Sequence, residues 1–402
     1  MTRPAGRQAA MVAVALTAPI IATGIVAAAT AALAAGASAQ TRGVTDSEIR
    51  IGGAHDLSGV FAAISTPAVN GANLYFDQVN ANGGVHGRQI RYIVEDHGYQ
   101  LPRATQAFNK LIERDQVFAM LLNLGTPHNL AHYPLMERRQ VPNLLPLTAA
   151  RQILPDPPGL NYTMIDSYYR EMIEGLRYIH EEHGLTRVCS MYLPTDFGEE
   201  VEAGSKDGAE QHGLTFVAET THRPDEQDFV GALTRLRSEG CEIVTIALGI
   251  RATITVVGTA KRLGWDDAKF LVSSAGFHEA VAEVPGGVTD GLYGAASWVD
   301  LRARAEDPVP AEFMAAYEER FGHAAGGFAM IGYAAAEIVV KALEAAGPDL
   351  TVESFVEGMH SIDYHNELLD TPISYRDGSH QGANTITIST VEDGAWRLRE
   401  RL

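Results

Sequence analysis

The chain has 402 residues, of which 46% are hydrophobic, and it carries 31 basic and 50 acidic side chains for a net charge of −19. A chain of this length exceeds one ordinary hydrophobic core and favours two domains. Its acidic balance argues against binding to nucleic acid or to anionic membrane surfaces, which attract basic proteins.

The N-terminal segment has the pattern of an export signal. Arg3 and Arg7 are its only charges, and an apolar stretch leads to the small residues 37–39. We expect cleavage after Ala39, which would place the mature chain in the periplasm. Loss of two arginines and no acid would take the net charge from −19 to −21. An uncleaved membrane anchor is the alternative, since the apolar run is long enough to span a bilayer, although it contains little Leu or Ile.

From Ile49 onward, short β-rich runs alternate with amphipathic helices, which is typical of parallel sheets covered on both faces. In the first half the sequence predicts strands at residues 49–55, 89–95, 117–122 and 143–145, and helices at residues 68–82, 104–114 and 130–139. A Pro-rich bridge follows at residues 155–159.

The same rhythm then restarts. It predicts helices at residues 169–183, 199–211, 229–238 and 252–263, and strands at residues 187–193, 214–219, 243–248 and 270–273. Residues 108–125 and 229–249 both run from amphipathic helix through polar turn and apolar strand to a glycine. This repetition predicts an α/β protein with two doubly wound, Rossmann-like lobes.

The C-terminal part differs, with helices predicted at residues 311–320 and 328–346 and strand-like pieces at 373–375 and 385–391. We expect these elements to pack back onto the two lobes. The chain would then cross between the lobes several times, which makes a hinge instead of a loose linker.

Two cysteines, Cys189 and Cys241, lie beside predicted strands. Export would allow a disulfide between them. Two buried free thiols are an equal alternative, because the sequence does not reveal the Cα separation that a disulfide requires.

The spacings that usually mark catalysis are absent from the sequence, including the phosphate-binding loop, the dinucleotide fingerprint and the Gly-x-Ser-x-Gly elbow. His180 and His183 stand three residues apart, which is more typical of a solvated helix end than of a metal site. We therefore expect a protein that is not an enzyme and that needs no cofactor or metal.

Small polar loops follow the predicted strands, where ligands of open α/β sheets bind. These loops contain Ser58 in the first lobe and, in the second lobe, Ser274 and Gly276. Tyr99, Tyr168 and Tyr169 would bring aromatic surface to the same mouth.

From Ile49 to about Val391 the chain resembles the branched-chain amino acid (leucine/isoleucine/valine) binding proteins of ABC transporters, which have the type I periplasmic binding protein fold. The resemblance rests on IRIGGAHDLSG at residues 49–59, NGANLYFDQVNANGGVHGRQIRYIVEDHG at 70–98, DFGEEV at 196–201 and DFVGALTRLRSEGCEIV at 228–244. It implies a monomeric extracytoplasmic receptor that closes on a small molecule and docks on a permease.

The resemblance also implies a set of ligand-binding positions. The amides of Gly125 and Thr126 would receive a carboxylate, with Thr148 and Ala149 in the next loop and Phe197 as an aromatic lid. Ala275 departs from the family pattern, because amino-acid binders keep an acid there to pair with the ligand's ammonium group. Arg251 stands where an aromatic or small residue is common, and it is either a ligand contact or a solvated helix start.

We therefore expect an N-terminal lobe of residues 46–164 and 298–379, and a C-terminal lobe of residues 165–297 and 380–402. The expected ligand is a small molecule with a carboxylate on an aromatic or aliphatic body. Branched-chain amino acid binding, a ligand-sensing module of the same fold and an exported enzyme are the alternatives.

Overall fold

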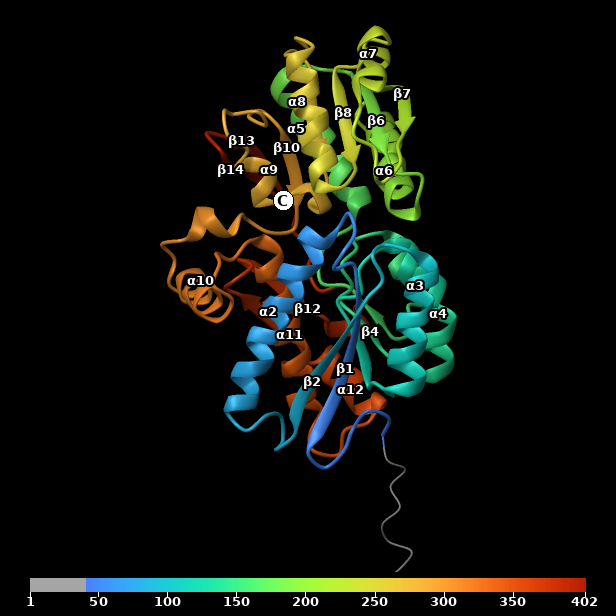
Figure 1. The fold of residues 1–402 in the computed structure, drawn as a ribbon, viewed down its shortest axis with the longest axis vertical. Coiled ribbons are helices and arrows are strands. Elements are labelled where there is room, and N and C mark those ends of the chain that lie inside the picture. The colour runs from blue at the N-terminus through green and yellow to red at the C-terminus, as the bar shows by residue number, and fades with distance from the viewer. Residues whose placement is uncertain (1–40) are drawn as a thin grey trace, which may run out of the picture. The chain divides into compact units, whose positions relative to one another are not determined.

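Residues 41–402 are described by a computed structural model, and the predicted export signal at residues 1–39 lies outside the described residues. The described part contains two separate main sheets (Figure 1), each covered by helices on both faces. None of the helices between residues 41 and 402 combines the length and the apolar composition that a membrane crossing requires.

The first sheet has five parallel strands in the order β2-β1-β3-β4-β5. Its strands are β1 (Glu48–His55), β2 (Gln89–Asp96), β3 (Ala119–Leu121), β4 (Asn143–Leu144) and β5 (Asn161–Tyr162). The central strand β3 is buried along its whole length, as expected of a strand with helices on both sides.

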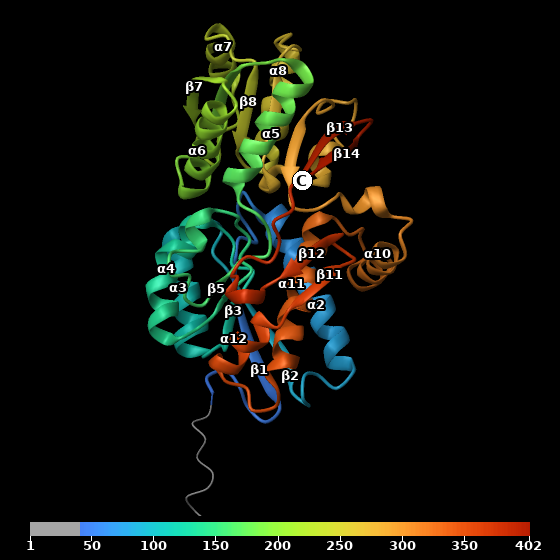
Figure 2. The same ribbon diagram turned by 180° about the vertical axis from the view of Figure 1, so that it is seen from behind.

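Helices from distant parts of the chain cover this sheet. In Figures 1 and 2, α3 (Leu101–Asn109) and α4 (Thr126–Arg139) lie on one face, and α2 (Ala62–Ala81) and α11 (Gly327–Ala346) on the other. The last two pack backbone to backbone, because a Cβ on Gly332 would stand 1.9 Å from the Ala68 carbonyl oxygen. Near them lie α10 (Pro308–Phe321), α12 (Val352–His360) and the hairpin β11 (Asp363–Asn366) and β12 (Thr371–Ser374).

The second sheet has seven strands in the order β14-β13-β10-β9-β8-β6-β7. Its parallel part consists of β6 (Arg187–Tyr192), β7 (Thr215–Thr221), β8 (Ile243–Ala247), β9 (Lys269–Val272) and β10 (Tyr293–Ala296). Two antiparallel strands, β13 (Thr387–Glu392) and β14 (Ala395–Arg401), complete it at one edge.

Helices again cover both faces of the second sheet (Figures 1 and 2). They are α5 (Tyr168–His183) with α6 (Asp196–Gln211), and α7 (Val230–Ser238) with α8 (Ile250–Arg262) and the short α9 (Glu279–Ala282). The prediction of two doubly wound lobes is therefore confirmed.

Three segments connect the two sheets, between β5 and α5, between β10 and α10, and between β12 and β13. They are hydrogen-bonded to one another: Thr163 N donates to the His380 carbonyl oxygen at 2.8 Å, and Asp166 N donates to Ser297 Oγ at 3.0 Å. The expected hinge of several strands is therefore present.

The predicted helices and strands are present with shifted ends, but β5, α9, β10, α12, β11 and β14 were not predicted from the sequence. Helix α2 begins at Ala62 instead of Ala68 and contains Pro67 in its interior. Strand β14 was missed because its outward side chains are charged and Trp396 is its one fully buried residue. Such charged edge strands lack the apolar alternation that identifies a strand in sequence.

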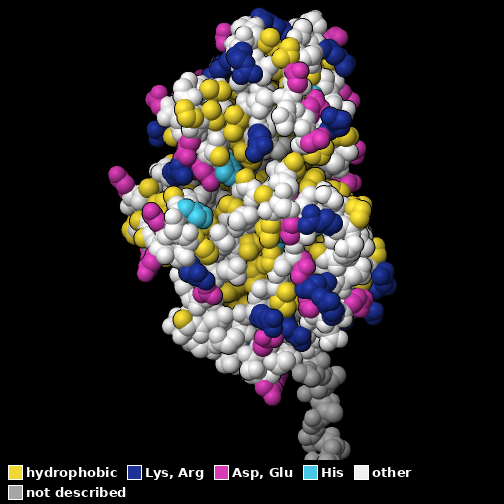
Figure 3. Space-filling model, in the orientation of Figure 1, with side chains coloured by type: hydrophobic (Ala, Val, Ile, Leu, Met, Phe, Trp, Pro, Cys, Tyr) yellow, Lys and Arg dark blue, Asp and Glu magenta, His cyan; other side chains and the backbone are white. Residues whose placement is uncertain are grey.

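The surface of the described residues mixes charges of both signs. On the face shown in Figure 3, Lys and Arg side chains lie among Asp and Glu side chains over both lobes. This mixture favours solubility and offers no broad basic surface on that face for a polyanion.

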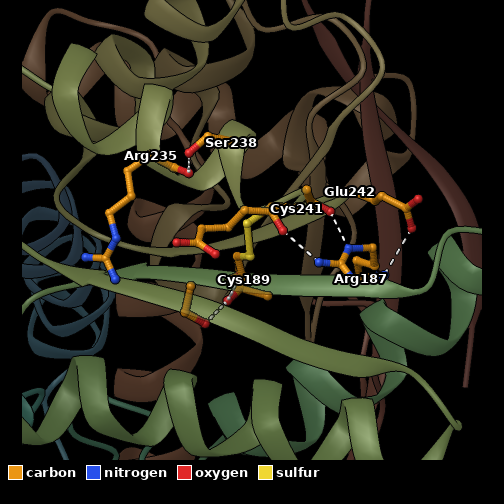
Figure 4. The surroundings of a disulfide bond; sticks show 10 residues. Arg187, Cys189, Arg235, Ser238, Cys241 and Glu242 are labelled. Atoms are coloured by element: carbon orange, nitrogen blue, oxygen red, sulfur yellow. Dashed lines mark hydrogen bonds between the residues drawn. A yellow bond between two sulfur atoms is a disulfide. The ribbon is translucent and has the colours of Figure 1, made fainter.

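Cys189 and Cys241 form a disulfide, which answers the question that the sequence left open (Figure 4). Cys189 lies on β6 and Cys241 lies two residues before the neighbouring strand β8, and their Cα atoms are 5.8 Å apart. Arg187 and Glu242 flank the disulfide and are linked by a 3.0 Å hydrogen bond from Arg187 N to the Glu242 carboxylate. The bond therefore joins adjacent strands at the start of the second sheet.

We predict that replacing both cysteines with alanine lowers the free energy of unfolding. The disulfide closes a loop over a sequence separation of 52 residues. The chain-entropy model gives about 4 kcal/mol for such a loop. Urea unfolding of the double variant and of the wild type would measure the loss, and wild-type protein reduced in urea should behave like the variant. Equal midpoints for variant and wild type would contradict the prediction.

Candidate ligand-binding site

A cavity lies where the carboxyl ends of the two sheets face each other. It encloses about 280 Å³, part of which is open to solvent, and its lining comes from both lobes. We call this cavity the first chamber. Its lining combines a polar end, an aromatic wall and the smaller apolar side chains Ile64, Leu124, Leu147 and Ala275.

The polar end is formed by the start of α4. Gly125 precedes this helix with φ of +100°, and a Cβ there would meet His128 Nδ1 at 2.4 Å. Glycine is therefore required for the turn that presents the first helical amide, that of Thr126, to the chamber. Thr126 Oγ1 and Thr148 Oγ1 are 2.7 Å apart and buried. Together with the positive end of the helix dipole, these groups form an environment that favours an anion.

The aromatic wall brings together residues from both lobes. Phe61 packs against Tyr99 at a ring-centroid distance of 4.6 Å and against Phe197 at 6.0 Å. Phe197 also packs against Tyr168 at 5.2 Å. Phe61 and Tyr99 follow strands of the first sheet, whereas Tyr168 and Phe197 begin helices that cover the second. A ligand in this chamber would therefore contact aromatic surface from both lobes.

A second chamber adjoins the first and encloses about 450 Å³. Five residues line both chambers: Ile64, Leu147, Thr148, Tyr168 and Ala275. Beyond them, the second chamber extends to Ser274, Trp298 and two residues of α11, Phe328 and Ile331.

The sequence-predicted site residues fall into three groups. The structure brings together Tyr99, Gly125, Thr126, Thr148, Tyr168 and Phe197 at the first chamber, and Ser274 at the second. Ala149 and Tyr169 line a separate cavity beside the hinge segments.

The remaining three predicted residues line neither chamber. Ser58 is exposed and donates a 2.7 Å hydrogen bond to the Asp96 carboxylate. Arg251 is exposed at the first turn of α8. Gly276 packs against Val272, whose Cβ would lie 2.6 Å from a Cβ at this glycine.

Sequence reasoning missed several apolar lining residues and one acid near the site, Glu171. Its side chain is fully buried, and its Oε2 accepts a 2.8 Å hydrogen bond from Ser274 N. Its Oε1 has no partner among the described residues. Burial raises the pKa of Glu171 well above its usual range, so a neutral carboxyl supports the loop that lines the chambers. The sequence signal for its burial was its position three residues after Tyr168, on the apolar stripe of α5.

The other nearby acids are engaged elsewhere. Asp166 is 2% exposed, pairs with Arg170 at 2.5 Å and lines the separate hinge-side cavity. The Glu279 carboxylate accepts a 3.3 Å hydrogen bond from Gly327 N. Among the described residues, no Asp, Glu, Lys, Arg or His lines the first or the second chamber.

Contacts across the cleft hold the lobes together. Pro67 has no N–H, so the Ala63 carbonyl four residues earlier in α2 lacks its helical donor. His278 of the other lobe supplies one, with its Nε2 3.1 Å from that oxygen. Its Nδ1 accepts from Ala280 N at 2.9 Å, which places the ring proton on Nε2. Arg151 and the buried Glu200 form a second link, with Arg151 Nε 2.8 Å from the carboxylate.

This geometry can be compared with known proteins. The family model described as periplasmic binding protein matches residues 48–395. The chain belongs to the periplasmic binding protein family. Its role is therefore that of an extracytoplasmic solute-binding protein, and the cleft between the lobes is where such a protein would hold its solute.

Individual relatives are distant. Leu/Ile/Val-binding protein homolog 8 of Brucella abortus is 19% identical over 330 residues, which cover 79% of this chain and 81% of the relative. A fatty acid ABC transporter substrate-binding protein from Thermomonospora curvata is 25% identical with a TM-score of 0.81, covering 90% of this chain and 93% of the other. A branched-chain amino acid ABC transporter protein from Thermus thermophilus with bound valine is 18% identical with a TM-score of 0.80, covering 89% and 97%.

We predict that Glu171→Gln makes this binding protein increasingly more stable than the wild type as pH rises above about 4, the ordinary pKa of a glutamate. The folded state keeps a proton on Glu171 that the unfolded state loses near the ordinary pKa, so wild-type stability falls with rising pH. The slope reaches about 1.4 kcal/mol per pH unit, and glutamine removes it. Urea unfolding at several pH values measures the difference. Glu174→Gln, at a carboxylate that pairs with Arg177 on the same helix, is the control. A difference between Glu171→Gln and wild type that does not change with pH would show that Glu171 is ionised in the folded protein.

Proposed function

We propose that this protein captures a small carboxylate-bearing molecule with an aromatic or aliphatic body and delivers it to the permease of an ABC importer. The observation that carries the proposal is a contrast in the described cavity lining: it offers groups that can receive an anion but no acidic side chain that can receive a cation. The start of α4 and the Thr126 and Thr148 hydroxyls can receive an anion, whereas no acidic side chain lines either chamber among the described residues.

This contrast disfavours a free amino acid. An ammonium group taken from water into an apolar cleft is destabilised unless an anion or several acceptors receive it. Asp166 is already paired with Arg170, and the raised pKa of Glu171 keeps its carboxyl neutral. A carboxylate without an ammonium group meets no such penalty.

The comparisons do not choose between these ligand classes. A neighbour named for fatty acids and a neighbour with bound valine have nearly equal TM-scores. Binding of branched-chain amino acids therefore stays as the alternative, favoured by the Leu/Ile/Val-binding relative. The lining residues of this chain are what favour the acid.

We further propose that the protein is not an enzyme and acts as a monomer. The described lining of the first chamber is hydroxyl, aromatic and aliphatic, without a histidine or carboxylate that would act as a general base. A binding role needs no such group. The same reasoning supports release of the solute unchanged to the permease.

The proposal also includes the signal-peptide cleavage site and the limits of the two lobes. Cleavage after Ala39 would release the mature protein into the periplasm. The lobes would comprise residues 46–164 with 298–379, and residues 165–297 with 380–402. These limits place each lobe boundary in one of the three segments that connect the sheets.

We predict that Thr126→Val and Thr148→Val each weaken the binding of carboxylates such as benzoate and octanoate. Loss of a hydrogen bond to a charged group weakens binding by about 1.5–3 kcal/mol, which is tenfold or more in Kd. Isothermal titration calorimetry measures the change. Thr255→Val is the matched control, because the Thr255 hydroxyl donates to the Arg251 carbonyl within α8.

The same titrations test the ligand class. Leucine and valine should bind at least tenfold more weakly than these acids, because their ammonium group lacks an anionic partner. Micromolar binding of leucine or valine without binding of the acids would overturn the proposal in favour of the amino-acid alternative.

We predict that ligand reduces the radius of gyration measured by small-angle X-ray scattering. A site divided between lobes is complete only when they meet, so ligand stabilises the closed form. His278→Ala removes the hydrogen bond to Ala63 across the cleft and should raise Kd by about fivefold, the effect of about 1 kcal/mol. An unchanged radius at saturation would favour a site within one lobe.

A further inference from the structure

The second chamber shares only Thr148 with the groups that would receive the carboxylate, yet it is the larger of the two. It measures about 450 Å³ against about 280 Å³ for the first chamber, and both figures include space that is open to solvent. A ligand confined to the first chamber would leave this volume unused.

The two chambers share part of their lining. Thr148 lines both, as do Tyr168 and Ala275. A molecule whose carboxylate lies at Thr126 and Thr148 would reach the second chamber by passing Tyr168 and Ala275. Ala275 lines both chambers with a single methyl group, so it presents neither a charge nor a long side chain between them.

The far part of the second chamber is apolar, with one polar exception. Leu145, Met164, Phe328 and Ile331 contribute hydrocarbon and aromatic surface. Trp298 also lines it and is 2% exposed, and its indole N–H has no acceptor among the described residues. A buried donor without a partner is destabilising, so an acceptor on a bound molecule would be favourable here.

Trp298 is held in place. Its ring packs edge-on against Phe277 at 6.0 Å and against Phe328 at 5.9 Å. Its carbonyl oxygen accepts a 2.8 Å hydrogen bond from Thr387 Oγ1. Because Trp298 belongs to a segment that connects the lobes, a ligand that reaches it would contact the hinge as well as both lobes.

We propose that the site takes an elongated carboxylic acid: the carboxylate at the start of α4, an apolar chain past Tyr168 and Ala275, and a distal oxygen acceptor at the Trp298 indole. This inference rests on the proposed function and specifies the length of the ligand and its second polar group. A keto, ether or hydroxyl oxygen would serve as the acceptor.

Titration calorimetry with butanoate, octanoate and 7-oxooctanoate tests the proposal on the wild-type protein. Octanoate should bind at least tenfold more tightly than butanoate, because its additional methylene groups enter the second chamber. The oxo acid should bind at least as tightly as octanoate. Equal affinities for butanoate and octanoate would overturn the inference and leave the proposed function standing. Failure of all three acids while benzoate binds would also overturn the inference alone, whereas failure of benzoate as well would overturn the proposed function itself.

Two variants locate the effect. Ile331→Phe fills the second chamber from α11 and should weaken octanoate binding at least tenfold while leaving butanoate unchanged. Trp298→Phe keeps an aromatic ring but removes the N–H, so it should weaken 7-oxooctanoate binding severalfold more than it weakens octanoate binding. Equal losses for both chain lengths in Ile331→Phe would contradict the proposed path. Unchanged 7-oxooctanoate binding in Trp298→Phe would overturn the role of the indole. The test of ligand length uses only the wild-type protein, so that test does not depend on whether either variant folds.

Discussion

The hydrogen bonds among the three segments that connect the sheets are the constraint on which the rest of the structure depends. Thr163 is bonded to His380 and Gly382, and Asp166 is bonded to Ser297. Because the connections are tied together, the carboxyl ends of the two sheets face each other. Loops that would otherwise be isolated helix caps then meet around one cavity, and motion is confined to opening and closing about the hinge.

Within that cavity, a few residues set the preference for an anion and the room available to a ligand. Gly125 permits the turn that aims the start of α4 inward, and the two threonine hydroxyls extend the polar end. Glu171 is close enough to support the lining loop, but its burial keeps it from acting as an anion. Ala275 lines both chambers with a single methyl group, so it adds no charge to either.

A proline within α2 gives rise to a contact between the lobes. A proline inside α2 leaves the Ala63 carbonyl without its helical donor, which by itself would destabilise the helix. His278 satisfies this carbonyl from the opposite lobe. In this structure the Ala63 carbonyl, which lacks a helical donor, therefore has a donor from the other lobe.

The sequence by itself determined the two doubly wound lobes and the crossing C-terminal segment, because periodicity is a local property. Of the six predicted site residues that line the first chamber, Gly125, Thr126, Thr148 and Phe197 followed from the family resemblance and not from periodicity. Only the tertiary structure decided the disulfide, the burial of Glu171, the contact of His278 with Ala63 and the second chamber. Each of these depends on distances between residues far apart in the chain. Arg251 and Ser58 show the same limit from the other side, since a residue in the right loop reaches the ligand only if its side chain points into the cavity, and packing sets that direction.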